Sequence, residues 1–299
     1  MNTTDQFNPR RILCPVDFSD LSALALKYAA AGARVFGAEL TALHVMQFEL
    51  PPFFTRSEVG RLKQQLKAAK ASAQKHLISH VRRTLGTLAE TLRLGYTVLE
   101  RPPAAGIIEA LEDGKYDLVV MGTHGRSGVQ RFLLGSVTET VVRNSPAPVF
   151  VVRQKEHDFI DVRDPEAAPR LKKILCPVND KATAQSSLAV AGALARRFDA
   201  ELTVLYVVEP GVRQTAPEAR RALCTWVPQD VAAQCAVQPR VKRGHAAEQI
   251  VQYAAQTTQD MIVLAAPARN RLSTRLFGET TELVLRRAPV PVLVLPVGA

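Results

Sequence analysis

The sequence predicts an α/β protein made of two similar open domains, each with a parallel sheet of five strands. Two observations support this fold class. The segment Ile-Leu-Cys-Pro-Val at residues 12–16 recurs unchanged at residues 174–178, and Pro-x-Pro-Val at residues 146–149 recurs at residues 289–292. Within each copy, short runs rich in Val, Ile and Leu alternate with stretches of helical spacing, which is typical of parallel strands buried between helices.

The repeat also predicts the domain boundaries. The two copies are offset by 162 residues at the first motif and by 143 at the last, so the second copy lacks 19 residues in its middle. The stretch that separates the copies is charged and contains proline, as linkers often do. We therefore assign residues 1–154 to the first domain, residues 155–170 to a linker and residues 171–299 to the second domain.

The first copy shows how each element is predicted. An apolar strand at residues 12–16 is followed by Asp-Phe-Ser-Asp at 17–20, and Asp and Ser are favoured helix caps, so a helix begins there. A strand at 40–46 precedes a long stretch of strong helix formers at 57–85. The remaining elements are expected as strand 96–99, helix 104–112, strand 118–121, helix 137–144 and strand 149–152.

Composition and charge limit the classes of function. With 47% hydrophobic and 22% charged residues, the chain has the composition of a soluble globular protein. Lys and Arg exceed Asp and Glu by ten, but both halves carry part of the excess and neither contains a run of five or six like charges. We therefore expect no nucleic-acid partner, and a small anionic ligand suits this diffuse charge better.

The sequence also predicts the compartment. No apolar stretch approaches the roughly 18 residues of a membrane span, and the first ten residues lack the apolar core of a secretion signal. The four cysteines have neither metal-binding nor disulfide spacing, and Cys14 and Cys176 lie in apolar runs. We expect a cytoplasmic protein that does not contact membranes and whose thiols at these two positions are buried and reduced.

The segment after the fourth strand is the strongest functional signal. Gly122 and Gly125 leave room for close backbone approach, and Gly135-Ser136 at a helix start offers backbone N–H groups, a hydroxyl and the positive end of the helix dipole. This combination favours phosphate binding, although glycines that simply form turns are the alternative. The fingerprints of a P-loop and of a dinucleotide fold are both missing, which argues against a motor-type NTPase and a dehydrogenase.

Other candidate residues follow neighbouring strands, whose carboxyl ends form the ligand crevice of open α/β sheets. Asp17 can accept hydrogen bonds from ribose hydroxyls or an exocyclic amine, or it can cap the next helix. Val45 is most simply a core residue whose backbone could reach a base. Arg126 could contact a polyphosphate or remain solvated. His124 is more simply a loop residue than a catalytic base, because its segment offers no carboxylate partner.

Taken together, these segments resemble the universal stress protein family. The matching pattern is Gly122-x2-Gly125-x9-Gly135-Ser136, with Pro-Val-Asp-Phe-Ser at 15–19, Leu-His-Val at 43–45 and Pro-Val-Phe-Val-Val at 148–152. The resemblance covers nearly all of the first copy and, more faintly, the second. It implies the tandem type, in which two adenine nucleotide alpha hydrolase-like domains pack as an internal pseudo-dimer.

The resemblance also implies a ligand, because nucleotide-binding members of the family hold ATP, here expected with Mg²⁺. To the positions that match those members we add Arg126, from its place in the glycine loop. The resulting cofactor-binding set is Pro15, Asp17, Val45, Gly122, Gly125, Arg126, Gly135, Ser136 and Val137.

The second copy departs from the pattern at this site. Asn179 stands where the first copy has Asp17, Ala-Ala-Pro-Ala at 265–268 replaces the first two glycines, and Glu279 replaces Ser136, while Gly278 is retained. The added methyl groups and proline obstruct close backbone approach, and a carboxylate repels phosphate. We interpret the second copy as a structural partner whose nucleotide site has degenerated.

Three functions remain open at this stage. The first is a stress-response regulator that binds ATP in the first domain. The second is a slow ATPase or autokinase with Ser136 or Thr138 as acceptor, for which no positioned base is apparent, so we expect no more than slow catalysis. The third is a nucleotide-free module for protein interaction.

The expected partners are an adenine nucleotide and a regulatory protein that the sequence does not identify. We also expect the last strands of the two domains to pair within one chain, and a homodimer of the whole chain is an open alternative.

Overall fold

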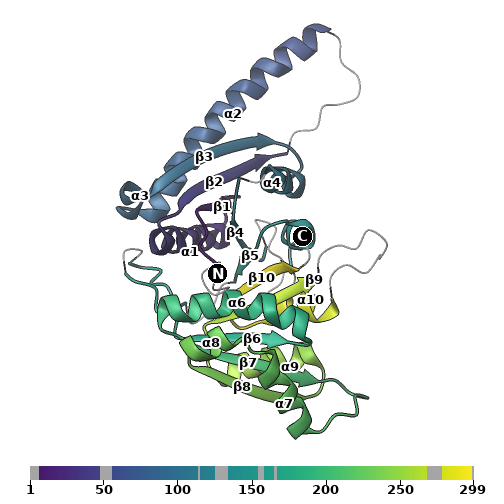
Figure 1. The fold of residues 1–299 in the computed structure, drawn as a ribbon. Helices are drawn as coiled ribbons and strands as arrows, with labels where there is room; N and C mark the ends of the chain where they lie inside the picture. Colours follow the sequence, from purple (N-terminus) through teal and green to yellow (C-terminus); the bar gives the residue numbers. More distant parts are fainter. Residues whose placement is uncertain are drawn as a thin grey trace.

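The computed structural model describes residues 7–47, 56–113, 115–124, 134–153, 158–164, 167–267 and 278–297. Its ten strands form one sheet in the order β3-β2-β1-β4-β5-β10-β9-β6-β7-β8 (Figure 1). Among the described strands, neighbours pair in parallel except β5 and β10, which are antiparallel. The predicted fold class, two five-stranded parallel sheets packed as an internal pseudo-dimer, is confirmed.

The first copy follows the expected order of elements. Ser19 caps its first helix by accepting a hydrogen bond from the backbone N–H of Ser22, as the Asp-Phe-Ser-Asp segment predicts. A short helix at Leu88–Thr91 was not predicted. The bounds are β1 Arg11–Pro15, α1 Asp20–Phe36, β2 Glu39–Met46, α2 Arg56–Leu85, α3 Leu88–Thr91, β3 Arg93–Glu100, α4 Pro103–Glu112, β4 Leu118–Gly122, α5 Ser136–Asn144 and β5 Val149–Val152.

The second copy repeats this order with shorter helices in its middle, where α7 and α8 take the place of α2 and α3. This is the region in which the repeat predicts 19 missing residues. The bounds are β6 Lys173–Val178, α6 Lys181–Phe198, β7 Glu201–Val208, α7 Ala216–Trp226, α8 Gln229–Gln234, β8 Val237–Arg243, α9 Ala246–Gln256, β9 Met261–Pro267, α10 Glu279–Arg287 and β10 Val292–Val297.

Helices cover both faces of the sheet, so the strands are buried on both sides. In β1, Ile12 and Cys14 point to the face covered by α1, α2, α6, α7 and α8, whereas Leu13 points to the face covered by α4, α5, α9 and α10. This double burial explains the continuous apolar strands. Cys14 and Cys176 are buried free thiols, as expected, and burial raises the pKa of both.

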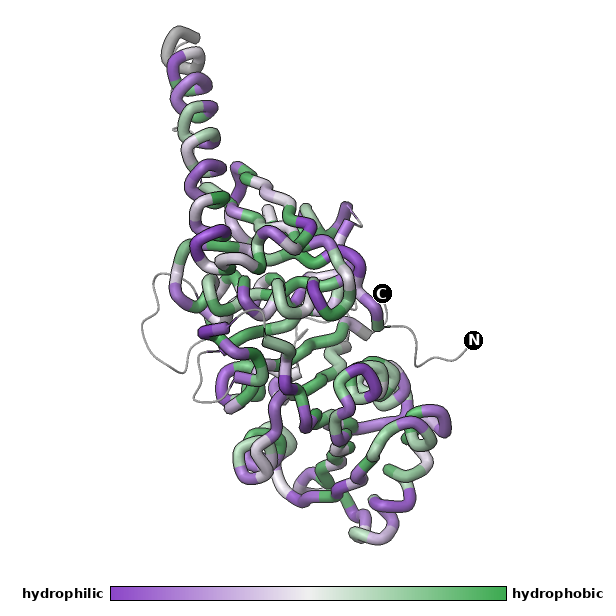
Figure 2. The backbone as a smooth tube through the Cα atoms, turned by 90° about the vertical axis from the view of Figure 1, so that its left-hand side faces the viewer, coloured by the Kyte–Doolittle hydropathy of each residue, from purple (hydrophilic) through white to green (hydrophobic). Residues whose placement is uncertain are grey.

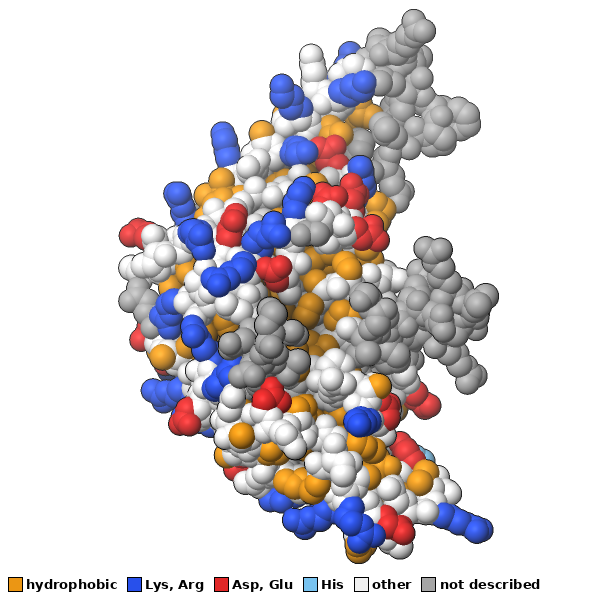
Figure 3. Space-filling view, viewed as in Figure 1, with side chains coloured by type: hydrophobic (Ala, Val, Ile, Leu, Met, Phe, Trp, Pro, Cys, Tyr) orange, Lys and Arg blue, Asp and Glu red, His pale blue; other side chains and the backbone are white. Residues whose placement is uncertain are grey.

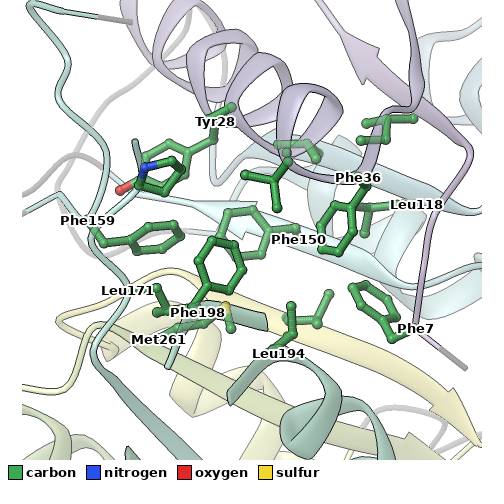
Figure 4. A pocket seen from close by; sticks show the side chains of 17 residues that line it. Phe7, Tyr28, Phe36, Leu118, Phe150, Phe159, Leu171, Leu194, Phe198 and Met261 are labelled. Carbon is green, nitrogen blue, oxygen red and sulfur yellow. The ribbon is translucent and has the colours of Figure 1, made fainter. Parts of the chain in front are cut away.

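The two halves of the sheet join at β5 and β10. Phe150 pairs with Leu293 at the centre of this antiparallel ladder. Because each strand is the edge of its own half, the pairing removes two exposed edges at once. On one face of this seam the side chains leave an apolar cavity of about 70 Å³, surrounded by rings such as Tyr28, Phe150 and Phe159 (Figure 4).

The segment between the copies lies against α1. Tyr28 donates a hydrogen bond from its hydroxyl to Asp158 at 2.6 Å, and Lys27 donates to the backbone oxygen of Val162 at 2.7 Å. Arg34, about two turns further along α1, donates to the backbone oxygen of Ala167. The described part of this connection is therefore tied to the first copy rather than extended through solvent.

The hydropathy of the chain follows the layers. Hydrophobic backbone segments concentrate in the strands and the inner faces of helices, while α2 is mostly hydrophilic where it extends past the sheet (Figure 2). None of the helices in the described ranges combines the length and apolar composition that crossing a bilayer requires.

Candidate functional site

The predicted crevice lies where the direction of the strand order changes. Strand β1 lies between β2 and β4, and the helices on either side of it cover opposite faces of the sheet. The connection that leaves β1 and the connection that enters β4 therefore run over opposite faces of the sheet and diverge at the carboxyl ends of these two strands. Ligands of open α/β sheets usually bind at this position. The structure brings Asp17, which follows β1, and Gly122, which ends β4, to this edge.

Asp17 shapes the turn between β1 and α1. Its Oδ1 atom accepts hydrogen bonds from the backbone N–H of Ser19 at 3.0 Å and from the Ser19 hydroxyl at 2.6 Å. Ser19 in turn caps α1. Asp17 thus supports the capping residue rather than capping the helix itself, and its half-buried carboxylate remains at the strand end. Pro15, the last residue of β1, is also half-buried.

Phe18 adopts an unusual conformation beside this aspartate. Its φ of 67° lies in the left-handed region, which costs a non-glycine residue energy unless the surroundings hold it in place. Its ring packs between three histidines, with centroid distances of 4.6 Å to His44 and His76 and 5.2 Å to His80. These contacts join the strand end to β2 and α2.

His80 is the most enclosed of these histidines. Its side chain is buried and its Nε2 atom has no hydrogen-bond partner among the described residues. Burial lowers the pKa of His80 below the ordinary value of 6.5, and the charges of Arg83 and His76 lower it further, while Asp17 acts in the opposite direction. The neutral ring is therefore the form that the fold favours.

Val45 forms the third side of the crevice. It lies near the carboxyl end of β2, paired with Leu99 of β3, and is half-buried. Helix α4 approaches it closely, since a Cβ added at Gly106 would lie only 2.9 Å from the Val45 Cγ1 atom. A glycine is therefore required at 106 for α4 to pack on this strand end. The contact between the Val45 backbone and a base stays a prediction.

Packing within the protein requires a glycine at position 122. A Cβ at this position would lie 2.7 Å from Cγ of Leu21, in the first turn of α1, so glycine lets β4 end against that helix. The backbone oxygen of Gly122 accepts a hydrogen bond from the Thr138 hydroxyl at 2.8 Å. This bond fixes the start of α5 to the end of β4, which positions the helix N-terminus at the crevice.

Gly135 and Ser136 form the start of α5. The backbone N–H of Gly135 donates to the oxygen of Thr123 at 2.7 Å, and a Cβ at Gly135 would meet that same oxygen at 3.1 Å. Gly135 is the N-cap, and among the described residues no side chain caps the helix. Ser136 is exposed and Val137 packs partly into the core. The first turn therefore presents backbone N–H groups and one hydroxyl at the crevice.

Two predicted contacts lie outside the described residues, namely Gly125 and Arg126. The described end of this loop contains Thr123, which is buried, and His124, whose Nδ1 atom is 3.0 Å from the Thr123 hydroxyl.

The corresponding edge of the second copy is built differently. Asp180 caps α6 by accepting from the backbone N–H of Thr183, and Asn179 accepts from the Thr183 hydroxyl at 2.6 Å. Glu279 is exposed in the first turn of α10, where it complements the helix dipole. A Cβ at Gly278 would meet no described atom within 4 Å, whereas one at Gly135 would meet the Thr123 oxygen at 3.1 Å.

Sequence reasoning missed several residues that hold the site together. Leu21 and Thr138 fix the backbone of Gly122, and Phe18 anchors the turn of Asp17 through the three histidines. A signal existed for Thr138, because it follows the Gly-Ser motif by two residues at a helix start. Nothing in the local sequence signals that His76 and His80 contact Phe18.

Comparison with known proteins identifies the family. The model of the universal stress protein family matches residues 8–153 and again residues 170–296, and the chain belongs to this family as a tandem of two such domains. Among curated relatives, the universal stress protein MJ0531 of Methanocaldococcus jannaschii is 34% identical over 151 residues, covering 50% of this chain and 85% of the relative.

Two full-length comparisons support the tandem arrangement. The universal stress protein Slr1230 of Synechocystis is 24% identical over 298 residues and covers 95% of this chain and 99% of its own. The crystal structure of a universal stress protein from Archaeoglobus fulgidus superposes with a TM-score of 0.67 at 20% identity, over 96% of this chain and 98% of that one. This second likeness shows the shared fold.

Proposed function

We propose that the protein is a stress-response regulator that binds ATP, with Mg²⁺, in its first domain. The observation that carries this proposal is the meeting of two groups at one edge of the sheet. The half-buried carboxylate of Asp17 follows β1, and the start of α5, which no described side chain caps, follows β4 at the same edge. A carboxylate suits the hydroxyl donors of a ribose, and a helix N-terminus suits phosphate.

Different residues of the first domain are suited to different parts of the nucleotide. The backbone N–H groups of Ser136 and Val137 and the Ser136 hydroxyl are suited to phosphate oxygens, because the helix dipole adds positive potential there. Asp17 and the backbone of Val45 are suited to the nucleoside. Pro15, Gly122, Gly125, Arg126 and Gly135 complete the proposed set. The tight contacts of Gly122 and Gly135 within the protein keep this backbone in place.

The structure narrows the autokinase alternative. Thr138 is 2% exposed and its hydroxyl donates to the backbone oxygen of Gly122, so it is held away from a γ-phosphate. Ser136 is exposed and remains the acceptor that this alternative requires. We propose binding without rapid turnover, and a turnover assay with Mg-ATP distinguishes binding from hydrolysis.

Two measurements on the full chain test the proposal. Mass spectrometry of small molecules released from the denatured, purified protein should find an adenine nucleotide. Calorimetric titration of nucleotide-free protein with Mg-ATP should give a stoichiometry near one. The third function, a nucleotide-free interaction module, predicts neither result, so the absence of both would replace our proposal with it.

A reciprocal pair of variants locates the site. Ser136→Glu places in the first domain the carboxylate that the second domain carries. A carboxylate about 4 Å from a phosphate costs about 1 kcal/mol in water and about 4 kcal/mol at an effective dielectric constant of 20. Affinity should fall about 5- to 1000-fold. The matched control Glu279→Ser should leave it unchanged, and the opposite pattern would place the site in the second domain.

A further inference from the structure

Helix α2 contains a concentration of positive charge. Between residues 60 and 85 the sequence has seven Lys and Arg and no Asp or Glu, against a net charge of +10 for the whole protein. Averaging the charge over each half of the chain hides this concentration. The expectation of no nucleic-acid partner depended on that average and on the lack of a run of like charges, whereas helical spacing brings the cations of α2 together without such a run.

The basic part of α2 is also the part that leaves the body of the protein. From Gly60 to His76 no side chain is fully buried, and contact with the first domain begins at Lys70, which pairs with Glu100, and at Ala73, which packs against the core. Figures 1 and 2 show the first part of the helix extending past the sheet from two directions. At 1.5 Å per residue the stretch from Gly60 to Lys70 is about 15 Å long.

Three lysines form a stripe along this projection. Lys63, Lys67 and Lys70 follow one another at helical spacings of four and three residues, so they lie on one side of α2. Lys63 and Lys67 are exposed, and Lys70 lies 3.4 Å from Glu100 while remaining 44% exposed. Lys and Arg side chains gather along α2 in the space-filling view (Figure 3).

We infer that this stripe binds the phosphate backbone of double-stranded nucleic acid without sequence preference. The stripe extends about 10 Å along the helix axis, which corresponds to about three nucleotide steps of one strand. Lysine contacts to phosphate give affinity that depends on salt and carries no direct sequence information.

The composition of the projection argues against other partners. Between Gly60 and Lys75 the apolar residues larger than alanine are Leu62 and Leu66, both half-buried, whereas membrane-surface helices present a broad apolar face. Protein interfaces have cores rich in aromatic residues and poor in lysine. A second copy of this chain would present the same cations and be repelled. Single strands require aromatic stacking platforms, which this stretch lacks.

Fluorescence anisotropy with a labelled 24-base-pair DNA duplex tests the inference on the full chain. Wild-type protein should bind at 50 mM salt, with affinity falling steeply towards 200 mM. The triple variant Lys63→Gln, Lys67→Gln, Lys70→Gln should bind at least about tenfold more weakly at 100 mM salt. Its log–log salt dependence should be shallower by up to about 2.7, since each lost phosphate contact accounts for about 0.9.

Two control variants distinguish the effect of the stripe on duplex binding from the effect of the protein's overall charge. Arg213→Gln, Arg220→Gln, Arg221→Gln removes the same charge from exposed positions of the second copy and should bind as wild type does. Lys63→Arg, Lys67→Arg, Lys70→Arg keeps the charge and should also bind. Circular dichroism should show equal helix content in every variant, because glutamine and arginine are good helix formers.

Several results would overturn the inference. These are no duplex binding by the wild type at 50 mM salt, equal losses in the stripe variant and the second-copy variant, or undiminished binding by the stripe variant. A vesicle assay tests the alternative that α2 binds an anionic membrane. If the wild type binds phosphatidylserine vesicles but no duplex, and the stripe variant loses the vesicle binding, α2 is a membrane-binding helix instead.

Discussion

The amino and carboxyl ends of the strands differ in how similar the two copies are. At the amino ends, both copies use the same hydrogen-bonding arrangement. Asp117 accepts hydrogen bonds from the backbone N–H groups of Arg10 and Arg11, and Asp260 does the same for Lys172 and Lys173. In each copy this carboxylate fixes the start of the first strand against the fourth, which the fold requires in both domains.

The carboxyl ends of the strands, where the proposed site lies, differ between the copies. The aspartate, the first two glycines and the serine of the first copy become Asn179, Ala265, Ala268 and Glu279 in the second, while Gly278 retains the third glycine. Because the strand pairing is the same in both, these changes are not needed for folding. The comparison teaches that folding constraints act on the amino ends of the strands, and that divergence concentrates where ligands bind in this fold class.

The helices next to the second strand differ as well. In the first copy Phe18 packs against His44, His76 and His80, whereas the equivalent region of the second copy packs Tyr206 against Trp226 at 5.0 Å. Tyr206 occupies the position that corresponds to His44. The first copy thus combines a titratable cluster with a long helix, and the second replaces both with a compact aromatic contact.

The largest expected effect comes from separating the copies. A fragment of residues 1–154 leaves β5 as an open edge, because its partner β10 is absent. Exposed edge strands pair with other chains, so we expect the fragment to form a dimer or larger species. Light scattering coupled to size-exclusion chromatography measures its mass. A monomeric fragment as stable as the full chain would contradict the role we give to the β5–β10 pairing.

A smaller effect is expected when the first copy receives the asparagine of the second. In Asp17→Asn the side-chain oxygen can still accept both hydrogen bonds from Ser19, so stability should change little. Hydrogen bonds to charged acceptors are stronger than those to neutral ones by about 1 kcal/mol or more. Affinity for Mg-ATP should fall about tenfold by calorimetry.

The matched control for this variant is Asn179→Asp. It should bind no additional nucleotide, because Glu279 still stands at the start of α10. Two titration results would remove Asp17 from the site: unchanged affinity in Asp17→Asn, or a second equivalent of ATP in Asn179→Asp.

The sequence was sufficient for the fold because the relevant signals are local or repeated. The strand at 12–16, the cap at Ser19 and the long helix that ends at Leu85 follow from burial pattern, capping chemistry and helix propensity. Helix α3 was missed because its four residues are too few to show a helical period. The convergence of Asp17 and Gly122 was predictable, since parallel strands bring their carboxyl ends to one edge.

The rest of the site could not be predicted, because it depends on contacts between distant residues. The packing of Phe18 against His80 joins positions 62 residues apart through the docking angle of α2. The requirement for glycine at Gly135 comes from the Thr123 backbone rather than from a ligand. Gly135→Val, an obvious test from sequence, would therefore disturb the protein itself, which is why Ser136→Glu is the better choice.

The histidine cluster predicts a difference in pH dependence between the copies. The pKa of His80 is lowered in the folded protein mainly by burial, so unfolded chains bind more protons as the pH falls below 6.5. Stability is therefore greatest above that pH and decreases through the acidic range. His80→Leu should reduce the loss of unfolding free energy between pH 7.5 and 5, measured by denaturant titration.

The exposed His245 of the second copy provides the control. His245→Leu also removes one histidine, but from an exposed position beside Glu209, so it separates the loss of an enclosed ring from the loss of any histidine. If both variants alter the pH dependence equally, the enclosed position of His80 is not its cause.

The smallest expected effect concerns two glycines inside the first helices of the copies. Gly32 of α1 lines the cavity at the seam, and a Cβ there would lie 3.6 Å from Cδ1 of Ile12, an ordinary contact. The second copy has Leu194 at the equivalent position, so the helix tolerates a side chain. Because alanine is favoured over glycine in helix interiors, Gly32→Ala should raise the unfolding free energy by about 1 kcal/mol.

Gly192 of α6 is the matched case, in which a steric contact opposes the stability gained from the higher helix propensity of alanine. A Cβ there would lie 3.0 Å from both Cγ atoms of Val231 in α8, so alanine must displace a packed helix. Its equivalent in the first copy is Ala30, which is fully buried. Denaturant midpoints should rise for Gly32→Ala and stay level or fall for Gly192→Ala. Equal stabilisation by both substitutions would show that helix propensity alone decides the outcome and that the packing of α8 against α6 imposes no constraint.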